Sequence, residues 1–64
     1  MQVAGVNYEI NWRGFTKGSS MFFPCLDPEV ARREINVVTQ RMQFKIITRI
    51  EVQDGIRGLR VWRL

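Results

Sequence analysis

The chain of 64 residues contains no histidine and a single cysteine, Cys25. Without histidine, the acid–base and nucleophilic schemes that depend on imidazole are closed to it. One cysteine cannot form an internal disulfide, and no Cys/His set is present that could hold a zinc ion. We therefore expect a protein that is not an enzyme and that binds no metal and no cofactor.

Long apolar runs are also missing. No stretch approaches the roughly 20 apolar residues that a membrane-spanning helix needs, and residues 1–5 lack the features of a signal peptide. A lone thiol without a disulfide framework fits a reducing compartment. These absences predict a soluble, cytoplasmic protein with no membrane contact.

Acidic residues are few, six against ten basic residues, which gives a formal net charge of +4. Eight of the ten basic residues are arginine, whose planar guanidinium group matches the geometry of phosphate and carboxylate. No pair of acids stands out for metal or glycosidic chemistry. The charge balance favours a polyanionic partner, either nucleic acid or the acidic surface of another protein.

A chain of this length predicts one domain, residues 1–64. So short a polypeptide buries only about 60% of the surface that its unfolded form exposes, which makes its core marginal. Small domains usually add disulfides, a metal or a partner subunit. Because composition excludes the first two, we expect either tight packing or oligomerisation, for example as a homodimer.

The last third of the sequence predicts a β-hairpin. Apolar and polar residues alternate from Phe44 to Val52, which is typical of a strand with one buried face. Asp54-Gly55 follows, a dipeptide that favours a tight type I′ turn. We expect the returning strand from Ile56 to Leu64.

A two-residue loop fixes which residues of this hairpin lie opposite each other, whereas a loop of odd length would exchange its two faces. The expected pairs are Ile47–Trp62, Thr48–Val61, Arg49–Arg60 and Ile50–Leu59. Leu59 and Val61 would then join the apolar face of the first strand.

The middle of the chain predicts one helix from Pro28 to about Met42. Asp27 can cap its first amides, Pro28 suits the first helical position, and Glu29 opposes the positive end of the helix dipole. Apolar residues recur at helical spacing and form the expected buried stripe: Ala31, Ile35, Val38 and Met42.

The first third alternates from Val6 to Trp12, which predicts a strand. A loop from Arg13 to Ser20 should follow, and then a short buried strand, Met21–Phe23, ended by Pro24. The order of elements is therefore β-β-α-β-β. We expect an α+β fold in which a small antiparallel sheet is covered on one face by a single helix.

Two segments resemble sites that could bind a ligand or react, but we interpret both as structural. Gly14–Ser20 is rich in small residues like a phosphate-binding loop, but it lacks the Gly-Lys-Ser/Thr order and does not lead into a helix. Its Lys17 can still contact a nucleic-acid backbone. Cys25 precedes a helix, which favours a reactive thiolate, but no base accompanies it, so we expect a small buried residue.

A basic cluster on the helix, Arg32, Arg33 and Arg41, is interrupted by Glu34 and has no helix-turn-helix partner. We interpret it as a solvated face. The stronger candidate is the sheet face opposite the helix.

On that sheet face, basic residues would lie beside Ile47 and Trp62. Two arginines directly opposite each other repel unless an anionic group lies across them. A tryptophan among basic residues is typical of surfaces that stack the bases of single-stranded nucleic acid. Alternatively, Trp62 and Ile47 pack against N-terminal residues or a second subunit. The expected nucleic-acid-binding residues are Lys17, Lys45, Arg49, Arg60 and Trp62.

The run from Lys17 to Pro24, a single helix, and the segment from Gly58 to Arg63 together resemble a group of short bacteriophage-encoded proteins of unassigned function. The likeness extends from Gly14 to Leu64. It implies a phage setting and a host cytoplasm but no site residues. We therefore expect a nucleic-acid-binding accessory or regulatory protein or, alternatively, a host-takeover or anti-defence protein that binds and inhibits a host protein.

Overall fold

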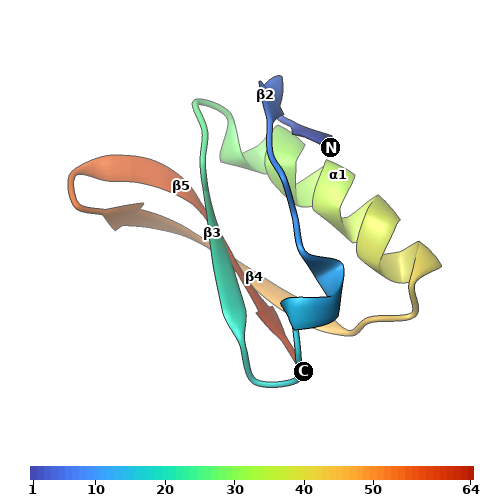
Figure 1. Cartoon of the computed structure of the whole chain (residues 1–64). Helices are drawn as coiled ribbons and strands as arrows, with labels where there is room; N and C mark the ends of the chain where they lie inside the picture. The colour runs from blue at the N-terminus through green and yellow to red at the C-terminus, as the bar shows by residue number, and fades with distance from the viewer.

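The computed structural model describes the whole chain, residues 1–64, and shows one helix packed on a small antiparallel sheet (Figure 1). The predicted α+β class is confirmed. The elements follow one another as β1 (Gln2–Val3), β2 (Val6–Asn7), the 3₁₀ turn η1 (Trp12–Gly14), β3 (Ser20–Pro24), α1 (Pro28–Arg41), β4 (Ile46–Gln53) and β5 (Ile56–Arg63).

The main sheet has three strands in the order β3-β5-β4, and both pairings are antiparallel. Asp54 and Gly55 both have positive φ, 52° and 76°, as a type I′ turn requires. All the predicted pairs of the hairpin are observed: Ile47–Trp62, Thr48–Val61, Arg49–Arg60 and Ile50–Leu59. The two-residue turn therefore fixes both the register and the two faces of the hairpin.

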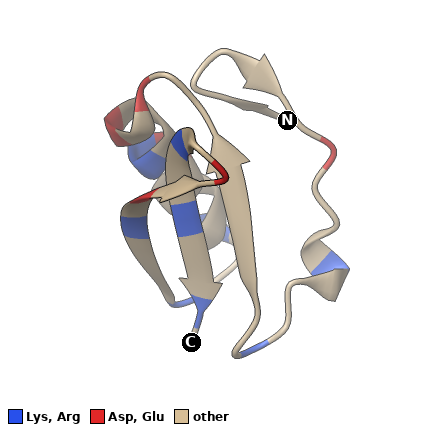
Figure 2. Cartoon of the chain, turned by 90° about the vertical axis from the view of Figure 1, so that its left-hand side faces the viewer, with Lys and Arg blue, Asp and Glu red and all other residues tan.

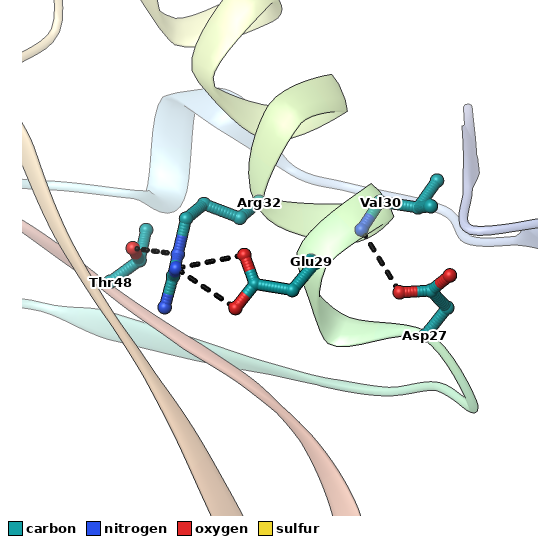
Figure 3. Close-up of polar contacts among 5 residues, drawn as sticks. All are labelled: Asp27, Glu29, Val30, Arg32 and Thr48. Atoms are coloured by element: carbon teal, nitrogen blue, oxygen red, sulfur yellow. Dashed lines mark hydrogen bonds and ion pairs between the residues drawn. The ribbon is translucent and has the colours of Figure 1, made fainter.

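Helix α1 begins where the sequence predicts and ends at Arg41, one residue before the predicted end. Asp27 is its N-cap, with Oδ1 accepting a hydrogen bond from the Val30 amide at 3.3 Å (Figure 3). One turn further on, Arg32 donates to the Glu29 carboxylate and to Thr48 Oγ1. Thr48 belongs to β4, so Arg32 joins the helix to the sheet.

Because Asp27 satisfies an otherwise unpaired amide at the helix start, Asp27→Ala should lower the free energy of unfolding by about 1 kcal/mol. Asp27→Asn keeps a capping oxygen and is the matched control, expected to cost only a fraction of that. Thermal and urea unfolding of the three proteins measure the difference. An Ala variant as stable as the parent would show that the cap contributes nothing.

The core lies between the inner face of the sheet, α1 and the N-terminal segment. Ile35 of the helix, together with Leu59 and Val61 of the central strand, is completely inaccessible to solvent. Thr39 continues the buried helical stripe and satisfies its hydroxyl by donating to the Ile35 carbonyl at 2.8 Å. The eight buried apolar residues of the core are Val3, Phe15, Phe23, Cys25, Ala31, Ile35, Leu59 and Val61.

The predicted strand from Val6 to Trp12 is wrong in extent. Ala4 and Gly5 make a tight turn with φ of 50° and 80°, so β1 and β2 form a two-stranded ribbon that ends at Asn7. The chain then runs irregularly beside β3 and α1 to the turn η1 (Figure 1). Its alternating apolar side chains pack against the core without joining a sheet: Tyr8, Ile10 and Trp12.

Strand β4 also differs from prediction at its ends. Phe44 lies before the strand, and its amide donates to the Thr39 carbonyl at the end of the helix. Val52, predicted to be on the buried face, is 68% exposed. The hairpin thus extends past the helix, and its turn region carries apolar side chains that the core does not cover.

Candidate functional site

The face of the sheet turned away from the helix is open. In the antiparallel pairing, residues directly opposite each other share a face. The central strand therefore contributes Trp62 and Arg60 to this face, β4 contributes Ile47, Arg49 and Glu51, and β3 contributes Ser20 and Phe22. Basic residues lie along both strands of the hairpin and none lies on β3 (Figure 2). We call these seven residues the outer face.

Trp62 lies in the middle of one row of the outer face. It is flanked by Ser20 on one side and by Ile47 on the other, and Ile47 is 53% exposed. Trp62 itself is partly buried and is not among the residues packed on the core. The alternative in which the N-terminal residues cover it is therefore wrong for a single chain, because that segment packs against the opposite face.

Both lysines lie at the end of the sheet next to Trp62. The Lys45 carbonyl accepts from the Leu64 amide at 2.9 Å, and Gly18, which follows Lys17, donates its amide to the Arg63 carbonyl at 2.8 Å. Lys17 and Lys45 are both exposed. The C-terminal residues of the sheet thus hold the two lysine-bearing segments on either side of the central strand.

Arg60 is held by groups of its own chain. Nε donates to Glu51 Oε2 at 3.3 Å, one terminal nitrogen donates to Ser20 Oγ and the other to Gln53 Oε1. The guanidinium carbon lies 5.2 Å from the centre of the Phe22 ring, a cation–π contact. Glu51 therefore supplies the anionic group that the sequence pattern led us to expect from a ligand, and it offsets the repulsion between Arg60 and Arg49.

Arg49 differs from Arg60 although the two lie directly opposite each other. It is exposed, and its side chain makes no hydrogen bond or ion pair within the chain. Its charge is thus available to a ligand. Of the predicted residues, the structure brings Lys45, Arg49 and Trp62 together on one accessible surface with Lys17 at its end, whereas Arg60 is already engaged.

The loop from Gly14 to Ser20 does not present its amides to a ligand. Thr16 donates to the Gly14 carbonyl, Ser19 donates to Thr16, and Gly18 donates to Arg63. Because these amides already have backbone partners, they cannot form a phosphate cradle. Within this segment, Lys17 is the residue left for contact with an anion.

Cys25 is buried, as expected from its surroundings. Burial raises the pKa of its thiol, a hydrogen bond with the Leu59 backbone lowers it, Asp27 raises it and Arg57 lowers it. The net shift is upward, so the residue is a neutral thiol and a poor nucleophile. The pKa of the Tyr8 phenol is also raised, by burial and by the neighbouring Cys25. The phenol donates a hydrogen bond to the Pro24 carbonyl.

Two basic side chains have structural roles that sequence patterns did not reveal. Arg32 is bound to Glu29 and Thr48, so the helix cluster is not a continuous cationic surface. Arg63 lies on the inner side, 3.6 Å from the centre of the Phe44 ring, and donates to the Phe15 carbonyl at 2.8 Å. The alternation of β5 was the available signal for Arg63, because it places this residue on the same face as Val61.

No three potential metal-ligating side chains lie together. No helix has both the length and the apolar character that a bilayer span demands. No family model, curated protein or solved structure matches this chain.

Proposed function

We propose that this protein binds single-stranded nucleic acid through the outer face of its sheet and has no enzymatic activity. The observation that supports this most directly is the position of Trp62, partly accessible on the central strand and beside the exposed Ile47. A base can stack on an indole ring, and such stacking is worth about 1–3 kcal/mol per base.

The charges around Trp62 suit a phosphate backbone. Lys17 and Lys45 are exposed at one end of the sheet, and Arg49 follows on β4 without a partner of its own. Arg60 donates to three neutral or acidic groups, and a guanidinium has five N–H donors, so it retains capacity for a phosphate oxygen. Phosphate contacts of this kind give affinity without reading the base sequence.

Binding of a labelled single-stranded oligonucleotide, followed by fluorescence anisotropy over a range of salt concentrations, tests the proposal. The double variant Lys45→Gln/Arg49→Gln should bind more weakly and flatten the salt slope by about 0.7 for each phosphate that is no longer neutralised. Arg33→Gln changes an exposed arginine on the helix and serves as the control. It should leave the slope unchanged.

Trp62→Ala should weaken binding by roughly tenfold or more if a base stacks on the indole. Because Trp62 is partly buried, the thermal unfolding of the Trp62→Ala variant must be compared with that of the parent protein. No binding by the parent protein at low salt would contradict the proposal. So would equal losses in the Arg33→Gln control and the sheet variants.

A protein partner is the second candidate, in keeping with an inhibitor that docks on a host protein. One apolar patch favours it: Leu26 is 102% exposed and Ile56 is 54% exposed, around a pocket of about 480 Å³ that also includes Cys25 and Val6. An interface anchored by apolar side chains should depend little on salt, whereas binding to phosphates should weaken steeply as salt rises.

A further inference from the structure

Strand β4 has an unpaired edge. The Leu64 amide donates to the Lys45 carbonyl, and by alternation residues 47, 49, 51 and 53 also direct their backbone groups toward β5. The intervening residues direct theirs away from the sheet: Ile46, Thr48, Ile50 and Val52. No strand lies on that side, so these amides and carbonyls have no backbone partners.

This edge lacks most of the features that usually prevent pairing with another chain, and its two charged side chains, Arg49 and Glu51, both lie on the outer face. It is eight residues long, contains no proline, has no bulge in its register, and has no charged side chain on its inner face. The opposite edge differs. Strand β3 has five residues, ends in Pro24, and has the Tyr8 hydroxyl bound to the Pro24 carbonyl. Of the two edges, β4 is the one suited to accept another strand.

The outward groups of β4 restrict how a second copy could pair with it. An antiparallel pairing about a two-fold axis at Arg49 would place Arg49 of one copy directly opposite Arg49 of the other. An axis at Thr48 would pair only residues 46–50 of each strand, whereas an axis at Ile50 pairs residues 47–53. In the last arrangement Arg49 of each copy lies directly opposite Glu51 of the other. That register joins longer segments than an axis at Thr48 and, unlike an axis at Arg49, sets two pairs of opposite charges against each other.

We propose that the protein forms a homodimer in which two β4 strands pair antiparallel about Ile50, so that the two sheets become one sheet of six strands. Arg49, which has no partner in a single chain, would gain one. Glu51 uses Oε2 for Arg60, and a carboxylate can accept several donors, so Oε1 remains for Arg49. The exposed Val52 would lie beside Thr48 of the second copy.

The dimer does not depend on the proposed function. In it Arg49 would face Glu51 of the other copy, and because a guanidinium has five N–H donors it would keep donors for a phosphate. A two-fold axis perpendicular to the joined sheet keeps both outer faces on one side. Two Trp62 side chains would then lie on one continuous surface, which could bind a longer nucleic acid than a single copy. Self-association is measured without nucleic acid, so the two proposals can fail separately.

Sedimentation equilibrium over a range of protein concentrations tests the dimer. The parent should dimerise, and Arg49→Glu should raise the dissociation constant by roughly tenfold or more, because the new carboxylate of each copy would face Glu51 of the other. The double variant Arg49→Glu/Glu51→Arg should restore dimerisation, since the opposite charges face each other again. Arg33→Glu changes the net charge equally at an exposed position of the helix and should have no effect.

Val52→Pro provides a test that does not depend on charge. The Val52 amide points away from β5, so proline should block the added strand and leave the hairpin bonds of β4 intact. Circular dichroism should confirm that this variant folds. A parent that is monomeric at every concentration would overturn the proposal. A dimer that withstands both Arg49→Glu and Val52→Pro, or that is weakened by Lys45→Glu but not by Arg49→Glu, would also overturn it.

Discussion

Replacing Phe15 with alanine should destabilise the domain by about 3–5 kcal/mol, the range for removing a large buried aromatic side chain. Phe15 is 2% exposed and packs between Trp12 and Phe44, with ring-centre distances of 6.1 and 6.4 Å. Its carbonyl also accepts from Arg63. Because domains of this size are stable by only about 5 kcal/mol, we expect the variant to be largely unfolded at physiological temperature.

Urea unfolding followed by tryptophan fluorescence measures this loss. Leu26→Ala is the control, since Leu26 is an apolar residue with a side chain fully exposed to solvent. Its replacement should change stability by no more than about 0.5 kcal/mol. If Phe15→Ala were as stable as Leu26→Ala, the N-terminal segment would not be part of the core.

Gly58→Ala should be comparably damaging for a different reason. A Cβ at this position would lie 2.4 Å from the Phe23 carbonyl oxygen and 2.7 Å from Phe22 Cζ. The carbonyl belongs to the neighbouring strand and cannot move without separating β3 from β5. Overpacking in well-packed regions costs about 1–3 kcal/mol, and we expect at least the upper part of that range because the obstacle is backbone.

Gly18→Ala separates this steric effect from the conformational freedom of glycine. A Cβ at Gly18 meets nothing within 4 Å, but its φ of 85° is strained for alanine. That strain should cost about 1 kcal/mol. Thermal unfolding of the two variants should therefore rank Gly58→Ala as clearly the less stable. The reverse order would mean that β3 and β5 can separate at little cost.

The hairpin and the helix could be predicted because short-range signals determine them. Asp54-Gly55 specifies a two-residue turn that allows only one register of the two strands, and the faces of both strands follow from that register. Asp27 marks the helix start through a bond that spans three residues. Neither inference needs knowledge of what the element packs against.

The N-terminal third could not be predicted in the same way. Tyr8, Ile10 and Trp12 alternate like a strand, but a strand also needs a neighbour with free backbone groups in register. Local alternation carries no information about that neighbour. The glycines and serines around Phe15 favour a loop, but the turn η1 next to it directs its side chain into the core.

The strand pairing of the candidate site could be predicted from the sequence, but its electrostatics could not. Pairing placed Arg49 opposite Arg60, which is correct. The diagonal contact from Arg60 to Glu51 depends on side-chain conformations, and the sheet register alone does not fix these. The two arginines consequently differ in how available their side chains are to a binding partner, and Arg49 is the one that both proposals use.

The strand order β3-β5-β4 also has a consequence for protein synthesis. The central strand β5 comes last among the strands, and every pairing in the main sheet includes it. No part of this sheet can therefore form until Ile56–Arg63 has left the ribosome. Before then the apolar residues of β3 and β4 are without partners on the nascent chain, a state in which exposed strands are prone to aggregate or to need chaperones.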